Sequence, residues 1–144
     1  MNSVEKLQQL LEDFALDVRE LEKRRKPGQG LLGFGTVPGD DPCHEKLDRQ
    51  LQELIASLEG QEGEDLSLFI EKLLGAEKQC DLPEYAHWTL IAGQRHCLPL
   101  IPALPPRAAQ KLLTDYEAAY PRRKRFPAQK AILQALKAAS EKKE

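Results

Sequence analysis

The sequence has few of the features that mark secreted or membrane proteins. It contains three cysteines in 144 residues, an odd number without the dense spacing of a disulfide framework. No stretch approaches the roughly 18 consecutive apolar residues that a membrane-spanning helix needs. Residues 1–14 mix charges with apolar residues, unlike a signal peptide. We therefore expect a soluble protein of the reducing cytoplasm that does not contact a membrane.

Recognisable catalytic motifs are also missing. The chain has no GxSxG nucleophile elbow and no HExxH metal motif. The spacing of Gly28, Gly30 and Gly33 matches GxGxxG, but a helical pattern rather than a strand precedes these glycines, and no Lys-Ser/Thr pair follows them. The sequence thus predicts neither an enzyme nor a cofactor.

The residues that are abundant favour helices. Glu, Lys, Gln, Leu and Ala dominate the chain, 41% of it is hydrophobic, and the alternating pattern typical of strands is missing. At this length a single domain is the simplest organisation. The prediction is an all-α fold, an irregular single-domain bundle of five to seven helices over residues 1–144, with a long glycine-rich loop after the first helix.

Apolar spacing and start signals place these helices. The first is expected over residues 4–25 with Asn2 or Ser3 as its cap, and the second starts at Asp40-Asp41-Pro42. Further helices are expected to start near residues 64 and 81 and to cover 106–119 and 127–139, with a proline-rich connector at 98–106 and a frayed tail at 140–144. The helix near residue 81 is apolar on almost every side, which favours a central, buried position.

The apolar stripe of the first helix allows two interpretations. It consists of Val4, Leu7, Leu11, Phe14, Val18 and Leu21. Such spacing suits a short coiled coil and hence a weak homodimer, but it covers fewer than three heptads. We therefore favour packing into the domain's own core, and the expected state is a monomer or a weak homodimer through this helix.

The loop at 26–41 is the most informative segment. It holds five of the nine glycines and places Leu31, Leu32 and Phe34 among them. Long loops in compact domains are usually functional or disordered, and apolar side chains on a loop need a surface to cover them. These three residues either pack on the bundle or bind a partner protein.

Charge is divided unevenly along the chain. Residues 1–100 carry eleven basic and nineteen acidic side chains, whereas residues 101–144 carry ten basic and four acidic ones. Arg122, Arg123, Lys124 and Arg125 form a run between Tyr120 and Phe126. The run either compensates the acidic part of the chain or contacts nucleic-acid phosphates, with the two aromatic rings as stacking faces.

Two further patterns carry weaker hypotheses. The possible metal ligands are Cys43, His44, Cys80, His87, His96 and Cys97, but no pair has CxxC or HxxxH spacing, so scattered structural roles are favoured over a zinc site. Residues 102–107 satisfy PxxPxR, a polyproline II recognition pattern, although the leucines between the prolines favour a buried connector.

Taken together, these patterns predict a non-catalytic protein-binding or adaptor domain that uses Leu31, Leu32 and Phe34. The alternatives are a nucleic-acid accessory protein using residues 122–125 and a metal-binding protein using the cysteines and histidines.

Overall fold

The computed structural model describes residues 2–24, 42–58, 64–79, 81–121 and 126–142. In these ranges the chain is helical, without strands, which confirms the all-α prediction. The elements are α1 (Ser3–Arg24), α2 (Pro42–Ala56), α3 (Glu64–Gln79), α4 (Glu84–Gly93), the short 3-10 helices η2 (Gln94–Cys97) and η3 (Ile101–Ala103), α5 (Pro106–Ala119) and α6 (Pro127–Ser140).

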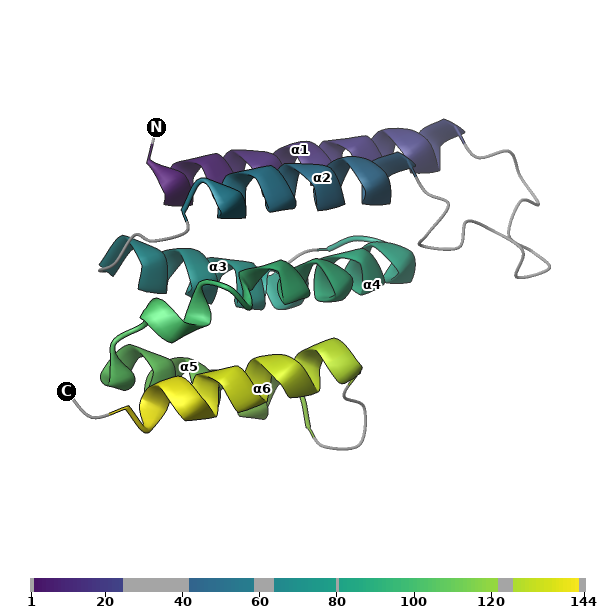
Figure 1. Cartoon of the computed structure of the whole chain (residues 1–144). Helices are drawn as coiled ribbons and strands as arrows, with labels where there is room; N and C mark the ends of the chain where they lie inside the picture. Colours follow the sequence, from purple (N-terminus) through teal and green to yellow (C-terminus); the bar gives the residue numbers. More distant parts are fainter. Residues whose placement is uncertain (1, 25–41, 59–63, 80, 122–125, 143–144) are drawn as a thin grey trace.

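The helices form three stacked antiparallel pairs. Figure 1 shows α1 beside α2, then α3 with α4, then α5 with α6, each pair roughly parallel to the next. The middle pair contacts both neighbours, because α3 packs on α1 and α5 while α4 packs on α2. The middle pair therefore supplies the walls of every hollow described below.

Local sequence explains where the helices begin. The Asn2 side chain accepts a hydrogen bond of 2.8 Å from the backbone N–H of Glu5, which caps α1. Proline begins α5 and α6, where the missing N–H costs nothing and the fixed φ suits the first turn. These starts match the sequence predictions.

The apolar stripe of α1 packs into the protein's own core. Leu7 and Val18 are fully buried and Phe14 nearly so, against α2 and α3. Leu11, a member of the predicted stripe, packs against the core but is only partly covered because it also lines a pocket, and Leu10, which the predicted stripe did not include, is buried. The face predicted for a coiled coil is thus occupied by the protein's own core.

The connector after α4 is compact. Leu100, Ile101 and Leu104 are buried, and the 3-10 turn at Ile101–Ala103 interrupts the polyproline II path that a PxxPxR ligand would need. The preference for a buried connector is confirmed.

The expectation for α4 is only half right. Its Ala86, Thr89, Leu90 and Gly93 are buried, but Trp88 on the opposite side is 44% exposed. Neighbouring helices cover the face with small residues, and the tryptophan is left facing solvent.

Candidate functional site

A groove with a volume of about 810 Å³ opens between α3, α4 and the residues around the start of α6. We call it the aromatic groove. It is lined by Glu77, Lys78, Leu82, Glu84, His87, Trp88, Ile91, Tyr120, Phe126 and Gln129. Its volume lies within the range of ordinary ligand and peptide pockets.

Two exposed aromatic rings dominate the groove. The ring centroids of Trp88 and Phe126 are 4.9 Å apart with a tilt of 58°, within the preferred geometry for an aromatic pair. Trp88 is 44% exposed and Phe126 36% exposed. A large apolar surface is thus held in place by ring contact and remains open to a partner.

The position of Phe126 follows from the way α6 begins. Its backbone N–H donates to the Oε1 atom of Gln129 at 2.9 Å, so the third residue of the helix fixes the residue before its first turn. The same bond fixes the amide orientation of Gln129. Its Nε2 atom is buried and has no hydrogen-bond acceptor in the described chain, an unsatisfied donor in a residue that lines the groove.

A chain of buried polar groups supports the back of the groove. Tyr116 donates to Gln94 Oε1 at 2.6 Å, Gln94 Nε2 donates to the Tyr120 hydroxyl at 3.2 Å, and that hydroxyl donates to Glu77 Oε2 at 2.8 Å. Gln94 is fully buried, and its Nε2 also lies 3.3 Å from the carbonyl oxygen of Leu74. Such a satisfied network fixes the wall in one arrangement.

His87 continues this network toward solvent. Its Nδ1 atom lies 3.3 Å from Glu77 Oε1, and its Nε2 atom lies 3.1 Å from the carbonyl oxygen of Leu82. His87 therefore joins α4 to α3 and to the segment between them.

The rim of the groove carries both signs of charge. Lys78 Nζ lies 5.0 Å from the centroid of the Tyr120 ring and 3.9 Å from Glu77 Oε2. Glu84 is exposed at the start of α4. No serine, threonine or cysteine is among the described residues that line the groove, and the hydroxyl of Tyr120 is engaged by Gln94 and Glu77.

A second polar cluster joins α2 to η2, away from the groove. Asp48 Oδ1 accepts from Arg95 at 2.9 Å and lies 2.6 Å from His96 Nε2. Partial burial by itself would raise the pKa of Asp48, but the hydrogen bond from His96 and the nearby charges of His96, Arg95 and His44 outweigh it, so the pKa is below its ordinary value. This cluster acts as a structural clasp.

The possible metal ligands fall in different places. His44, His87 and His96 contact Thr89, Glu77 and Asp48 respectively, and Cys43 and Cys97 are buried. Burial raises the pKa of the Cys97 thiol to about 12, which keeps it protonated. Within the described ranges no three His, Cys, Asp or Glu residues gather as a metal would require, and Cys80 lies outside them.

The other residues singled out by sequence also lie outside the described ranges. These are Leu31, Leu32 and Phe34 in the loop, and Arg122, Arg123, Lys124 and Arg125 in the basic run. Of the two aromatic residues that flank the run, Tyr120 is buried against Tyr116, whereas Phe126 is exposed. Only Phe126 thus offers an open stacking face.

Sequence reasoning missed Trp88 as a surface residue. The signal was present, because Ala86, Thr89, Leu90 and Gly93 recur at the spacing of a close-packing helix face and Trp88 falls opposite them. Glu84, four residues earlier, shares the face of Trp88.

Comparison with known proteins adds no identification. No protein-family model, curated protein or solved structure matches the chain. Among the described residues, no helix is both long enough and apolar enough to cross a membrane.

Proposed function

We propose that this chain is a non-catalytic protein-binding domain of the cytoplasm and that the aromatic groove is its partner site. The observation that carries the proposal is the exposed pair of Trp88 and Phe126 over a groove of about 810 Å³. Tryptophan is the residue type most enriched among the side chains that dominate protein interfaces. The sequence-based choice of Leu31, Leu32 and Phe34 remains an additional possible contact.

A hydrogen-bond network orders one wall of the aromatic groove in the free protein. The hydrogen bonds from Tyr116 through Gln94 and Tyr120 to Glu77 hold its wall before any partner arrives. A wall that is already ordered loses little conformational entropy on binding, so more of the contact energy becomes affinity. The mixed charges of Lys78 and Glu84 suit the polar rim that surrounds an apolar contact.

The proposal is tested by affinity capture with matched surface variants. Trp88→Ala removes the projecting ring, and Leu68→Ala is the control, because Leu68 is 51% exposed but does not line the groove. We expect the wild type and Leu68→Ala to retain the same partner and Trp88→Ala to lose it, with binding at least about tenfold weaker. Equal retention by all three proteins would remove the groove from the proposal.

A second candidate is single-stranded nucleic acid, supported by one observation. Phe126 follows the basic run 122–125 directly in sequence and presents an open ring beside Trp88. Stacking faces combined with cations are the usual elements of single-strand binding. Titration of an oligonucleotide while Trp88 fluorescence is recorded, at two salt concentrations, distinguishes the candidates, because nucleic-acid binding would quench the emission and weaken steeply with salt.

A further inference from the structure

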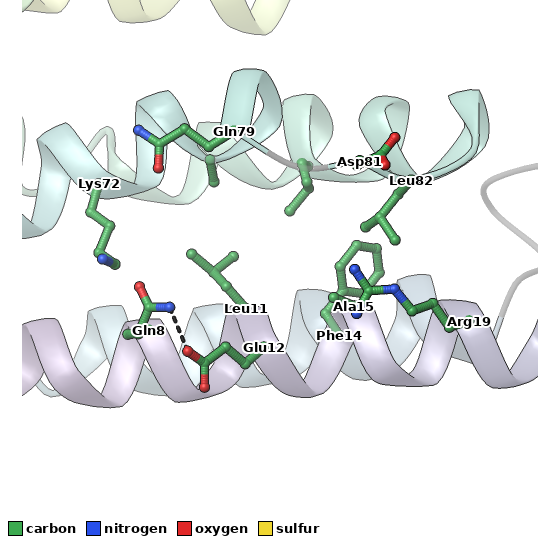
Figure 2. A pocket seen from close by; sticks show the side chains of 12 residues that line it. Gln8, Leu11, Glu12, Phe14, Ala15, Arg19, Lys72, Gln79, Asp81 and Leu82 are labelled. Carbon is green, nitrogen blue, oxygen red and sulfur yellow. Dashed lines mark hydrogen bonds between the residues drawn. The ribbon is translucent and has the colours of Figure 1, made fainter.

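A second hollow lies on the other side of the middle helix pair. It has a volume of about 310 Å³, lies between α1, α3 and the start of α4, and is shown in Figure 2. Its apolar surface comes from Leu11, Phe14, Ala15, Ala76, Leu82 and Leu90. We call it the alanine pocket. Its size is at the lower end of the range for small-molecule sites.

Two small side chains explain why the pocket exists. Ala15 on α1 and Ala76 on α3 both line it. The residues one turn away on the same helix faces are longer, with Leu11 and Arg19 on α1 and Lys72 on α3. Helix interfaces are normally filled to a high density, so short side chains on both walls leave a recess between the longer ones.

Charge distinguishes the two ends of the pocket. Figure 2 shows Lys72 at one end, opposite the Gln8 amide, and Arg19 with Asp81 at the other. Gln8 donates to Glu12 Oε1 at 2.7 Å, so that carboxylate already accepts a hydrogen bond. Lys72 is partly buried and forms no ion pair within the described ranges. An ammonium that has no ion pair and lies at the end of an apolar recess can pair with the charged end of a ligand that enters the recess.

We propose that the alanine pocket binds a small amphipathic carboxylate. The apolar body of the ligand fills the space over Ala15 and Ala76, and its carboxylate pairs with the ammonium of Lys72. This ligand is distinct from the partner of the aromatic groove, although Leu82 lines both hollows. The site therefore stands whether or not the groove binds a protein.

The test uses a matched pair of probes, hexanoate and hexanamide, which share the apolar chain and differ in charge. Binding is followed by amide shifts in two-dimensional NMR spectra of the full chain. We expect shifts at residues 11–19 and 72–79, and hexanoate to bind about fivefold more tightly than hexanamide at low salt, since a partly exposed ion pair contributes about one kcal/mol. Failure of hexanoate to bind, or equal affinity for the two probes, would overturn the proposal.

Three variants locate the site. Lys72→Gln should reduce the preference for hexanoate to about one, whereas Lys78→Gln, on the same helix but at the other hollow, should leave it unchanged. Ala15→Leu should abolish binding of both probes by filling the pocket, with circular dichroism to check the fold. If that variant does not fold, Ala15→Met provides the same test. Binding that survives filling of the pocket, or a preference that survives Lys72→Gln, would contradict the assignment.

Discussion

The aromatic groove and the alanine pocket are built in opposite ways. At the groove, large rings project from the surface, with Trp88 and Phe126 in tilted contact and both exposed. At the pocket, the short side chains of Ala15 on α1 and Ala76 on α3 leave a recess in the surface. Projecting rings gain most when a broad surface covers them, whereas a recess gains most when a small body fills it. This difference is the reason why we propose a macromolecular partner for the aromatic groove and a small ligand for the alanine pocket.

The two hollows also differ in what lies behind them. Hydrogen bonds centred on Gln94 support the groove, while packed apolar side chains such as Phe14 and Leu90 form the floor of the pocket. The stability of the polar wall depends on the presence of every hydrogen-bond partner, whereas the stability of the apolar floor depends on how fully its side chains fill the space. Substitutions can therefore weaken one hollow without the other.

The largest effect is expected from Gln94→Leu. The change leaves the Tyr116 and Tyr120 hydroxyls without their amide partner in a buried site and should lower the free energy of unfolding by about 3 kcal/mol. Urea unfolding measures this loss. The control is Gln79→Leu at the exposed rim of the pocket, with an expected change within about 0.5 kcal/mol. Similar losses in both variants would show that the hydrogen bonds of Gln94 stabilise the fold no more than an exposed residue at the pocket does.

A smaller effect is expected at the clasp, which belongs to neither hollow. The lowered pKa of Asp48 means that its carboxylate stabilises the fold above the ordinary aspartate value of about 4, and that this contribution disappears as the pH falls through the lower, folded-state value. Asp48→Asn should cost about 1–2 kcal/mol at neutral pH. The difference in the free energy of unfolding between Asp48→Asn and the wild type should shrink on acidification, and urea unfolding at several pH values measures it. A difference that is constant with pH would contradict the ion-pair account.

Removal of the exposed indole should affect stability less. Trp88→Ala is expected to lower the free energy of unfolding by less than about 1 kcal/mol, because the ring is already partly solvated. Leu90→Ala, two residues along the same helix and buried, is the reference and should cost about 2 kcal/mol or more. Equal costs would mean that Trp88 belongs to the core rather than to a binding surface.

The smallest effect is expected at the pocket. Lys72→Met should raise the free energy of unfolding by up to about 0.5 kcal/mol at low salt, because it removes a charge that has no ion pair within the described ranges and places an apolar side chain beside the recess. Lys78→Met should give no such gain, since Lys78 contacts the Tyr120 ring and Glu77. Thermal unfolding of the two variants side by side measures this difference, and a loss of stability in Lys72→Met would weaken the case for the anion site.

The helices could be predicted from sequence because their signals are local. Prolines at 106 and 127 and the aspartates before Pro42 mark starts, and the spacing of apolar residues marks buried faces. The predicted stripe omitted the buried Leu10 and did not show that Leu11 is only partly covered, because the spacing of apolar residues alone does not show which side of a helix faces a recess. That depends on Ala76, more than sixty residues further along the chain.

The candidate site was largely beyond sequence reasoning. Phe126 was recognised as a possible stacking face, but its contact with Trp88 joins residues far apart in the chain. The same holds for Glu77 of α3, His87 of α4 and Tyr120 directly after α5, which meet only after the helix pairs stack. The binding roles predicted for residues 31–34 and 122–125 remain predictions, because both segments lie outside the described ranges.

The central claim is that Trp88 lies in an open surface that a protein partner covers. Trp88 is the single tryptophan of the chain, so its fluorescence can be read without interference. The direct measurement is acrylamide quenching of this emission, before and after addition of the proteins captured by the wild-type chain. The account predicts ready quenching of the free protein and strong protection once the captured proteins are added. A free protein that resists acrylamide, or quenching that the captured proteins leave unchanged, would contradict it.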